Sequence, residues 1–446
     1  MDTKQIVTRM APSPTGRFHV GGIRTAFYNY AFARQKGGTF ILRIEDTDKE
    51  RNDEAYEQEV YEVFSWLGMD YDEVYRQSEH LPRHQEVLRE LIEKGLAYEA
   101  EDANDGTGKV IRFKNPNKSI TFTDQILGEV TVDTTDLGDF VIARNIDSPL
   151  YHLAVVIDDH DEDVTNVIRA QEHLANTPRQ ILLIEALGFD LPTYAHVPFI
   201  LGPDGKKKLS KRDANVAALD YRDDGYLPEA LLNFLAFIGW NPGTDQEVFS
   251  KDELIKTFSL DQVQKGPGGF NLDKLAWLNK QHLNKLSDEE FANYLEPEMT
   301  PIRSLPGFDQ DIWMKVLPIV RERTHSFVDV RQMIESGDLG YYFADPDLDP
   351  QAIVWKKGTV EGTITHLAKV LKMLEGYKGA WDRESLEALL YPYAEEVGKG
   401  NVLWPLRYSL SGKDKSPDPF SLLVILGPEV SKRRVQQGIE LTKKAA

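Results

Sequence analysis

The chain has 446 residues and no cysteine, and its content of 41% hydrophobic and 28% charged residues is typical of a globular protein with about three domains. The lack of cysteine excludes disulfides, a cysteine nucleophile and cysteine-ligated zinc. No apolar stretch approaches the ~20 residues of a membrane span and no cleavable leader is recognised, so we expect a cytosolic protein without a membrane partner. The formal net charge of −20 argues against a protein that coats nucleic acid indiscriminately, although a local basic track would still bind a selected RNA.

The stretch from residue 11 to residue 24, APSPTGRFHVGGIR, predicts a loop that opens into a helix. Pro12, Pro14 and Gly16 prevent a regular strand or helix across the loop. Apolar residues then recur at helical spacing up to the Gly-Gly pair at 37–38. Strands are expected on either side, over residues 5–10 and 39–44.

His19 stands directly before the first turn of this helix, next to Gly21 and Gly22. A helix N-terminus with small residues attracts phosphate, because its free backbone N–H groups and the helix dipole both face the anion. An imidazole there can donate a hydrogen bond to a phosphate oxygen. By itself the pattern HVGG is weak, and a surface histidine before a Gly-Gly turn is the alternative.

Two helices and a β-rich segment follow. The helices are predicted from a cap at Asn52 to Leu67 and from Pro82 to Gly95. Short β-rich segments separated by Gly, Asn and Asp fill residues 98–150 and predict a small antiparallel insertion. The α/β pattern resumes at residues 151–158, YHLAVVID, which we predict to be a near-continuous apolar strand.

An acidic run, DDHDED, occupies residues 158–163. Its carboxylates can coordinate a divalent cation, but the run lacks the glycine and the ligand spacing of a calcium loop. A solvated acidic loop is therefore the prediction.

A second predicted strand, over residues 164–168, is followed by polar residues. It should deliver Arg169, Glu172 and His173 to its C-terminal end, where open α/β sheets place their ligands. A plain surface charge is the alternative for the arginine. Thr177 is expected to cap the next helix, because a proline follows it.

A basic loop, GPDGKKKLSKR, covers residues 202–212 and reverses the sign of charge in an acidic chain. A solvated basic face is the alternative. Helical segments predominate after it, beginning at Pro228. Capping boxes are expected at Ser250 with Glu253 and at Ser287 with Glu290, and boundaries at residues 296–307 and 340–350.

HVGG at residues 19–22, together with KLSKR at residues 208–212, resembles the two signature sequences of class I aminoacyl-tRNA synthetases. The surrounding segments closely resemble the bacterial-type glutamyl-tRNA synthetase family; they read RMAPSPTGRFHVGGIRTAFYNYAFARQKGG, FILRIEDTD, VIRAQEHLANTPRQILL and LPEALLNFLAFIGW. This likeness extends over roughly the first two thirds of the chain and is much more specific than either short motif.

The resemblance implies an α/β fold class, with a Rossmann-like parallel-sheet catalytic domain, a β-rich insertion and a mostly α-helical C-terminal half. The implied domains are the catalytic domain at 1–77 and 151–203, an acceptor-stem-binding insertion at 78–150, the KLSKR loop with a stem-contact domain at 204–288, and a helical anticodon-binding region in two parts, 289–372 and 373–446. Residues 99–114 look shortened relative to members with cysteine-ligated zinc, which this chain cannot bind in that way.

The implied reaction is the ATP-dependent attachment of L-glutamate to tRNA(Glu), with release of AMP and pyrophosphate. The α-carboxylate of glutamate would attack the α-phosphorus of ATP, and the terminal ribose hydroxyl of the tRNA would then attack the glutamyl-adenylate. Because one anion attacks another, charge neutralisation and in-line positioning are the main barriers. Mg²⁺ is expected beside the pyrophosphate and the protein is expected to be a monomer, while charging of tRNA(Gln) stays open.

The resemblance also implies site residues. His19, Lys208 and Lys211 would be the catalytic residues, because they can neutralise the phosphate chain. The ATP site would consist of His19, Gly21, Gly22, Glu172, His173, Lys208, Leu209, Ser210 and Lys211. The amino-acid site would consist of Arg9, Ala11, Ser13, Glu45, Tyr151 and Arg169. The planar fork of an arginine can bind the side-chain carboxylate of glutamate in a bidentate manner, and Glu45 can hold the substrate ammonium.

Four alternatives share parts of this pattern: a glutaminyl-tRNA synthetase-like enzyme, a shorter relative that modifies queuosine in tRNA, a tRNA-independent nucleotidylyltransferase and a catalytically silent tRNA-binding module. Residues 290–446 argue against the two shorter enzymes. Arg321, Arg323 and Arg407 are candidate RNA contacts, with a solvated charge as the alternative for each.

Lys211→Ala is expected to abolish adenylate formation, because removing one such donor typically lowers the rate by about 10²- to 10³-fold. Glutamate-dependent pyrophosphate exchange measures this loss, and the fold and tRNA binding should stay nearly intact. Normal exchange in the variant would refute the role of Lys211.

Overall fold

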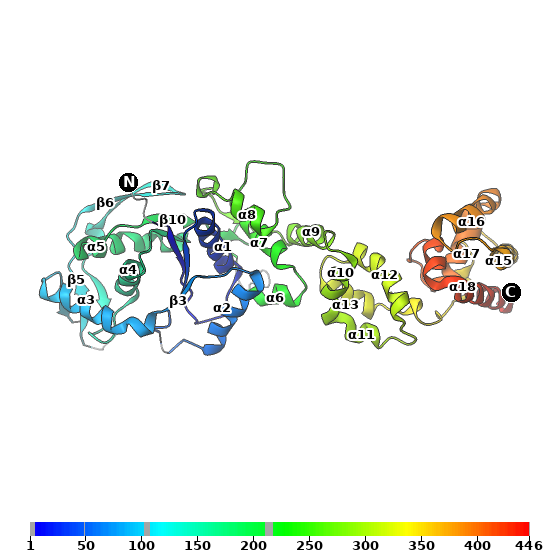
Figure 1. Cartoon of the computed structure of the whole chain (residues 1–446), viewed down its shortest axis with the longest axis horizontal. Coiled ribbons are helices and arrows are strands. Elements are labelled where there is room, and N and C mark those ends of the chain that lie inside the picture. The colour runs from blue at the N-terminus through cyan, green and yellow to red at the C-terminus, as the bar shows by residue number, and fades with distance from the viewer. Residues whose placement is uncertain (1–4, 49, 102–107, 210–216, 446) are drawn as a thin grey trace. The chain divides into compact units, whose positions relative to one another are not determined.

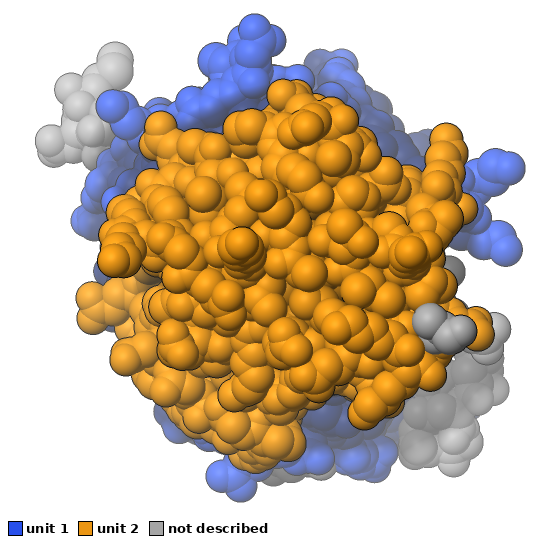
Figure 2. Space-filling model, turned by 90° about the vertical axis from the view of Figure 1, so that its right-hand side faces the viewer, with its two compact units in different colours: residues 1–282 blue, residues 283–446 orange. Residues whose placement is uncertain are grey.

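The computed structural model describes residues 5–48, 50–101, 108–209 and 217–445 (Figure 1). The chain divides into two compact units, residues 1–282 and residues 283–446, which Figure 2 shows in blue and orange. Among the described helices none is both long enough and apolar enough to cross a membrane.

A parallel sheet forms the centre of the first unit. Strands β1 (Val7–Met10), β2 (Thr39–Ile44) and β3 (Glu73–Arg76) pair in parallel in that order. Strands β9 (Asn166–Ala170) and β10 (Thr193–Val197) form a second parallel pair. Thr165 joins the two sets, because its backbone N–H donates to Val7 O at 3.1 Å and its hydroxyl accepts from Val7 N at 2.9 Å. The predicted Rossmann-like parallel sheet is thereby confirmed.

The β-rich insertion contributes to two sheets. Strands β4 (Ala97–Ala100), β5 (Val110–Phe113) and β8 (Phe140–Ala143) form a small antiparallel sheet. Strands β6 (Ser119–Asp124) and β7 (Gly128–Asp133) form an antiparallel hairpin, and β6 also pairs in parallel with β10. The insertion therefore extends the catalytic sheet, in the order β7-β6-β10-β9.

Five helices cover these strands: α1 (Val20–Gln35), α2 (Glu54–Leu67), α3 (Leu81–Glu93), α4 (Tyr151–Asp161) and α5 (Thr177–Leu187). Two predicted caps were wrong by one position. The carboxylate of Asp53, not Asn52, accepts from the first turn of α2, and Asn176, not Thr177, precedes α5. Asn and Asp cap equally well, which explains the first error. The 3₁₀ turn Gln171–Asn176 leads directly into α5 without a side-chain cap, which explains the second.

Residues 151–158 are the start of helix α4, so the predicted strand over YHLAVVID was wrong. Six consecutive residues of this helix, from Leu153 to Asp158, are buried. A helix that is buried around most of its surface reads as a continuous apolar run, and periodicity alone cannot distinguish it from a buried strand.

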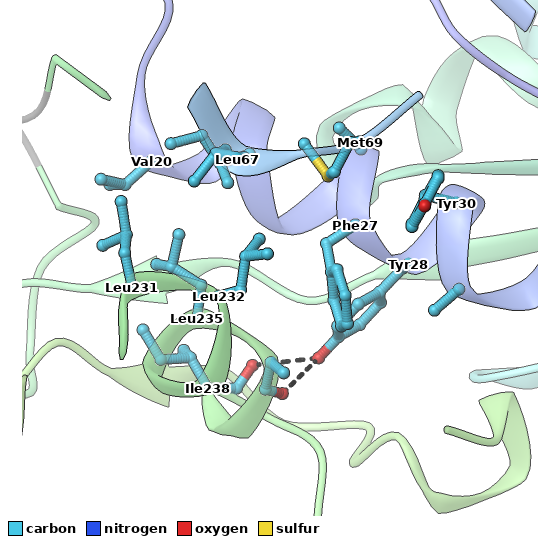
Figure 3. Close-up of a cluster of buried hydrophobic side chains, with 14 of the residues drawn as sticks. Val20, Phe27, Tyr28, Tyr30, Leu67, Met69, Leu231, Leu232, Leu235 and Ile238 are labelled. Carbon is cyan, nitrogen blue, oxygen red and sulfur yellow. Dashed lines mark hydrogen bonds between the residues drawn. The ribbon is translucent and has the colours of Figure 1, made fainter. Parts of the chain in front are cut away.

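Helix α1 packs on helix α7 (Pro228–Phe237) in the core of the first unit (Figure 3). The hydroxyl of Tyr28 donates to Ala236 O at 3.0 Å, and the guanidinium of Arg24 donates to Ile238 O at 3.0 Å and to Pro198 O. These contacts fix the helix that begins at HVGG. The remaining elements of this part are β11 (Ile200–Leu201), α6 (Ala218–Asp223), α8 (Lys251–Thr257), β12 (Gly268–Gly269) and α9 (Leu272–Leu283).

The described residues of the second unit form helices joined by loops and contain no strand. Its helices are α10 (Asp288–Tyr294), α11 (Met299–Arg303), α12 (Gln310–Arg323), α13 (Phe327–Glu335), α14 (Pro350–Ile353), α15 (Val360–Gly376), α16 (Arg383–Val397), α17 (Lys399–Ser411) and α18 (Pro419–Lys444). The predicted capping boxes at Ser250 and Ser287 are both confirmed. Arg321, Arg323 and Arg407 each donate hydrogen bonds within this unit, to Leu286 O, Asp338 and Asp414 O respectively.

Leu235→Ala is expected to lower the free energy of unfolding of the first unit by about 2–5 kcal/mol, because the side chain is fully buried between α7 and α1. Pulse proteolysis across a urea series measures the change. Leu191→Ala removes the same atoms from a side chain that is 53% exposed, so its effect should stay within about 0.5 kcal/mol. Equal effects of the two substitutions would contradict the packing described for α7.

Candidate active site

His19 is the N-cap residue of α1, and its Nδ1 accepts a hydrogen bond from Gly22 N at 3.3 Å. Because Nδ1 accepts, the neutral imidazole carries its proton on Nε2. A Cβ on Gly22 would lie 2.8 Å from the ring of Phe18, and one on Gly21 would lie 3.1 Å from the His19 ring. Gly21 therefore permits the close fit of the imidazole against the first turn of the helix, and Gly22 permits that of the Phe18 ring.

The basic loop returns to this histidine turn. Lys208 forms an antiparallel bridge with Leu201, and Leu209 N donates to Ile200 O at 2.9 Å. Ser210 and Lys211 belong to residues 210–216, which lie outside the described residues. Where the described chain resumes, Ala217 forms an antiparallel bridge with His19. The chain is thus held on either side of residues 210–216, at β11 and at the histidine turn.

Glu172 connects the two segments electrostatically. Its Oε2 accepts from Lys208 Nζ at 2.5 Å, and that ammonium also lies 5.1 Å from the centre of the Phe199 ring. The hydrogen bond from Lys208 lowers the pKa of Glu172, against a smaller effect of burial, and the charge of Lys208 lowers it further; His173 and His19 lie near enough to act on the same carboxylate. The structure therefore brings His19, Glu172 and Lys208 into one site.

Two buried arginines of the parallel sheet occupy the neighbouring pocket. Arg9 of β1 donates from Nε to Asp159 at 2.9 Å, and Arg43 of β2 donates from Nη2 to Asp159 and to Glu162, each at 2.6 Å. Burial would raise the pKa of Asp159, but the charges of Arg9 and Arg43 outweigh it and lower the pKa to about 2. A buried carboxylate with charged partners is strongly favoured in its ionised form.

The acidic run at residues 158–163 is only in part the solvated loop predicted from its charge, because His160, Asp161 and Asp163 are exposed whereas Asp158, Asp159 and Glu162 are largely withdrawn from solvent. It forms the C-terminal end of α4 and the residues after it, and Asp158 is fully buried. Asp158 accepts hydrogen bonds from Gln77 at 2.6 Å, His84 at 2.5 Å and Tyr75 at 3.1 Å. Buried cationic and hydrogen-bonding partners from other elements, which the sequence does not show, take these carboxylates out of solvent.

Glu45 follows β2 and its side chain is only 10% exposed. Burial raises the pKa of Glu45 to about 7, against the charges of Arg43 and Arg9, which lower it. Arg43 Nη1 has no hydrogen-bond partner among the described residues and lies 3.9 Å from the Glu45 carboxylate. A group that titrates near neutral pH next to buried cations is typical of a functional site.

Tyr151, Arg169 and His173 lie near these charged groups. The hydroxyl of Tyr151 is 3.2 Å from His173 Nδ1. Burial and the charge of Glu45 raise the pKa of Tyr151, and Arg169 and Arg9 lower it, so these four groups share one electrostatic environment. Burial, with the charge of Arg169, lowers the pKa of His173 to about 4, and this imidazole is therefore neutral at pH 7.

The APSPTG loop runs along the end of β2. Pro12 and Pro14 are buried, and their carbonyl oxygens accept from Glu45 N and Asp53 N, each at 3.0 Å. Ser13 is exposed between the two prolines, and Ala11 is half-buried. The loop thus places Ala11 and Ser13 beside the backbone of Glu45.

Four further residues complete the site but were missed from the sequence: Arg43, Asp159, Asp124 and His196. Arg43 lies inside the apolar strand TFILRI, and His196 lies inside YAHV. A charged or titratable residue within an otherwise apolar buried strand is the signal that identifies such residues, because burial of a polar group requires a partner.

Comparison with known proteins agrees with this geometry. Residues 5–106 and 99–277 match the family described as class I tRNA synthetases (E and Q), catalytic domain, and residues 290–439 match an anticodon binding domain. The Glutamate--tRNA ligase 1 of Coxiella burnetii (strain RSA 331 / Henzerling II) is 36% identical over 98% of both chains. The Glutamate--tRNA ligase of Nitrosospira multiformis is 37% identical, over 98% of this chain and 99% of that one.

Solved structures give the same relationship. A crystal structure of a glutamate tRNA ligase from Elizabethkingia meningosepticum, in complex with its amino acid, aligns with a TM-score of 0.88 at 31% identity. The alignment covers 98% of this chain and 99% of that chain. A glutamate-tRNA synthetase from Elizabethkingia anophelis aligns with a TM-score of 0.86, also at 31% identity.

Glu45→Gln is expected to raise thermal stability above neutral pH. Folded Glu45 holds its proton up to about pH 7, whereas an ordinary glutamate loses it near 4.5. Between these two pH values the folded state binds more protons than the unfolded state, so the free energy of unfolding falls as the pH rises from 4.5 to about 7. The neutral variant lacks this loss. Melting temperatures of both proteins from about pH 5 to about pH 8 measure the difference, which should grow with pH.

Asp159→Asn provides the contrast, because its paired charge is stabilising. The substitution leaves Arg9 and Arg43 without their shared carboxylate. The free energy of unfolding is expected to fall by about 3–5 kcal/mol. A melting temperature of Glu45→Gln that follows the wild type at every pH would contradict the raised pKa of Glu45.

Proposed function

The chain belongs to the class I tRNA synthetases for glutamate and glutamine and is a ligase that attaches glutamate to tRNA, and we propose that it does so in two steps at the site described above. Glutamate first reacts with ATP to form glutamyl-adenylate and pyrophosphate. The ribose hydroxyl of tRNA(Glu) then attacks the adenylate and releases AMP. The observation that carries this proposal is that the described chain on either side of residues 210–216 returns to one site, through the ion pair of Lys208 with Glu172 and the bridge of Ala217 with His19.

His19 and Lys208 would bind the phosphate chain of ATP. The Nε2–H of His19 can donate to a phosphate oxygen, because its Nδ1 is held by Gly22 N. The ammonium of Lys208 would exchange its ion pair with Glu172 for a phosphate oxygen. Such contacts lower the barrier because the attacking carboxylate and the α-phosphate are both anionic. Lys211, which lies outside the described residues, remains a proposed third donor.

Arg169 would bind the side-chain carboxylate of glutamate, and Glu45 would bind its ammonium. A guanidinium has only donors, so it matches a carboxylate and cannot accept from the amide of glutamine. Arg9 adds positive charge to the same pocket, and Asp159 fixes its orientation through the 2.9 Å contact at Nε. The two opposite charges of the pocket thus match the two ends of the substrate.

Mg²⁺ would arrive with ATP as part of the substrate. Within the described ranges no group of three or more Asp, Glu and His side chains is arranged to hold a metal ion. A magnesium ion coordinated mainly by phosphate oxygens and water needs no such cage. We propose a monomer as the active species, because one chain supplies both the histidine turn and the pocket.

The alternative functions account for less of the chain. A tRNA-independent nucleotidylyltransferase or a queuosine-modifying relative leaves the match of residues 290–439 to an anticodon binding domain unexplained. A glutaminyl enzyme shares the catalytic family, but Arg169 and the glutamate ligases among the relatives favour glutamate. Aminoacylation of tRNA(Glu) and tRNA(Gln) side by side tests whether the second tRNA is also charged.

Glutamate-dependent pyrophosphate exchange, measured with and without tRNA, tests the proposal. Lys208→Met should lower the exchange rate by about 10²- to 10³-fold at an unchanged melting temperature, because one phosphate donor is lost. Lys206→Met is the matched control, because this lysine lies exposed on the same loop. Its backbone N–H, and not its side chain, donates to Asp204, and the substitution keeps that contact. Exchange that does not depend on glutamate, or an equal effect of the two substitutions, would overturn the proposal.

A further inference from the structure

Three neighbouring strands carry a row of polar side chains, Asp124 of β6, His196 of β10 and Arg169 of β9, called here the Asp–His–Arg row. His196 and Arg169 are direct partners in the parallel register of β10 and β9. Asp124 Oδ2 lies 2.6 Å from His196 Nδ1, and Arg169 Nε donates to His196 Nε2 at 3.1 Å. All three are at most 6% exposed, so the row crosses the interior of the sheet.

The carboxylate of Asp124 determines which nitrogen of His196 carries the proton. Burial would raise the pKa of Asp124, but hydrogen bonds from His196 and from Leu127 N lower it, so the group is ionised. An ionised carboxylate only accepts, and His196 therefore presents Nδ1–H to it. Nε2 is then an acceptor and can receive the Nε–H of Arg169. Burial, with the charge of Arg169, lowers the pKa of His196 despite Asp124, which keeps the ring neutral.

Thr177 holds a second edge of the same guanidinium. Its Oγ1 accepts from Arg169 Nη2 at 2.8 Å and lies 3.1 Å from His196 Nε2. The guanidinium also lies 5.4 Å from the centre of the Tyr194 ring. No hydrogen bond to Arg169 Nη1 is found in the part of the chain that the structure describes. The guanidinium is thus fixed at Nε and at Nη2, where His173 O also accepts at 3.5 Å, and the N–H groups of Nη1 are left for a ligand.

We infer that Asp124, His196 and Thr177 are positioning residues that hold Arg169 in the orientation that binds the side-chain carboxylate of glutamate. This inference rests on the proposed function of Arg169. A bidentate contact needs a fixed fork, and supporting hydrogen bonds supply that orientation before the substrate arrives. Because Asp124 belongs to the insertion, its hairpin also completes the amino-acid pocket.

Asp124→Asn tests the direction of the hydrogen bonds. The oxygen of the asparagine can still accept from Ile126 N and Leu127 N, which now contact Oδ1 at 2.9 and 2.8 Å. Its NH₂ would face His196 Nδ1 and move the ring proton to Nε2, where it opposes the Nε–H of Arg169. We expect the KM for glutamate to rise by about 10- to 100-fold, the usual effect of losing a supporting group, and the KM for ATP to stay within about twofold.

Two pairs of variants separate positioning from folding. His196→Phe keeps the ring but removes the acceptor, whereas the Oε1 of His196→Gln can still accept from Arg169, so the second variant should recover part of the affinity. Thr177→Val and Thr177→Ser form the milder pair at the other edge of the fork. Each is measured by pyrophosphate exchange with tRNA present, by calorimetric binding of glutamate and by melting temperature.

Two controls disturb the structure without touching the row. His84→Phe breaks another buried Asp–His pair, the 2.5 Å contact with Asp158, and should lower the melting temperature at an unchanged KM for glutamate. Thr121 lies on the same strand as Asp124, and Thr121→Ala removes its exposed 2.9 Å hydrogen bond with Thr131. A wild type that neither binds glutamate nor supports exchange would overturn the proposed function, and this inference with it.

The inference alone fails in a different outcome. The wild type would then be active, while Asp124→Asn and Thr177→Val fold and keep the KM for glutamate within about twofold of the wild type. If Asp124→Asn and His196→Phe do not fold, the Thr177 pair decides. A raised KM for Thr177→Val that Thr177→Ser restores supports positioning, and a KM that both leave unchanged overturns it.

Discussion

Burial of two arginines inside a parallel sheet is the constraint on which the site depends. Arg9 and Arg43 lose their hydration in the sheet, and this cost is offset only by close carboxylates. Asp159 and Glu162 supply them from the C-terminal end of α4 and the residue after it, although a helix dipole disfavours negative charge there. The ion pairs therefore fix α4 against the sheet, and with it Tyr151 at the first turn of that helix.

The same constraint explains the unusual state of Glu45. The carboxylate lies beside this network but is not one of its close partners, at 3.9 Å from Arg43 Nη1. Burial then dominates over attraction and raises its pKa to about 7. On the proposed role of Glu45, the ammonium of the substrate would supply the close partner that Arg43 does not provide. A site that stabilises its ligand in this way is less stable when empty.

The ATP side of the site is held by apolar packing instead of buried charge. Helix α1 is anchored on α7 through the core in Figure 3 and through Arg24 and Tyr28, so the imidazole of His19 starts from a rigid helix. The chain on either side of residues 210–216 is attached at β11 and at the histidine turn. Two proposed phosphate donors, His19 and Lys208, held in this way suit a reaction in which charge neutralisation limits the rate.

The sequence by itself determined the local features: the HVGG helix start, the strands around it, the capping boxes at Ser250 and Ser287, and the family, because each depends on residues close together in the chain. It could not separate Asn52 from Asp53 as a cap, since both have the same local chemistry. Only the tertiary structure decided that residues 151–158 are helical and that Asp158, Asp159 and Glu162 of the acidic run are withdrawn from solvent. Those outcomes depend on partners such as Arg9 and Arg43, more than a hundred residues away, and pairing between distant strands likewise joined Asp124 to His196 and Arg169.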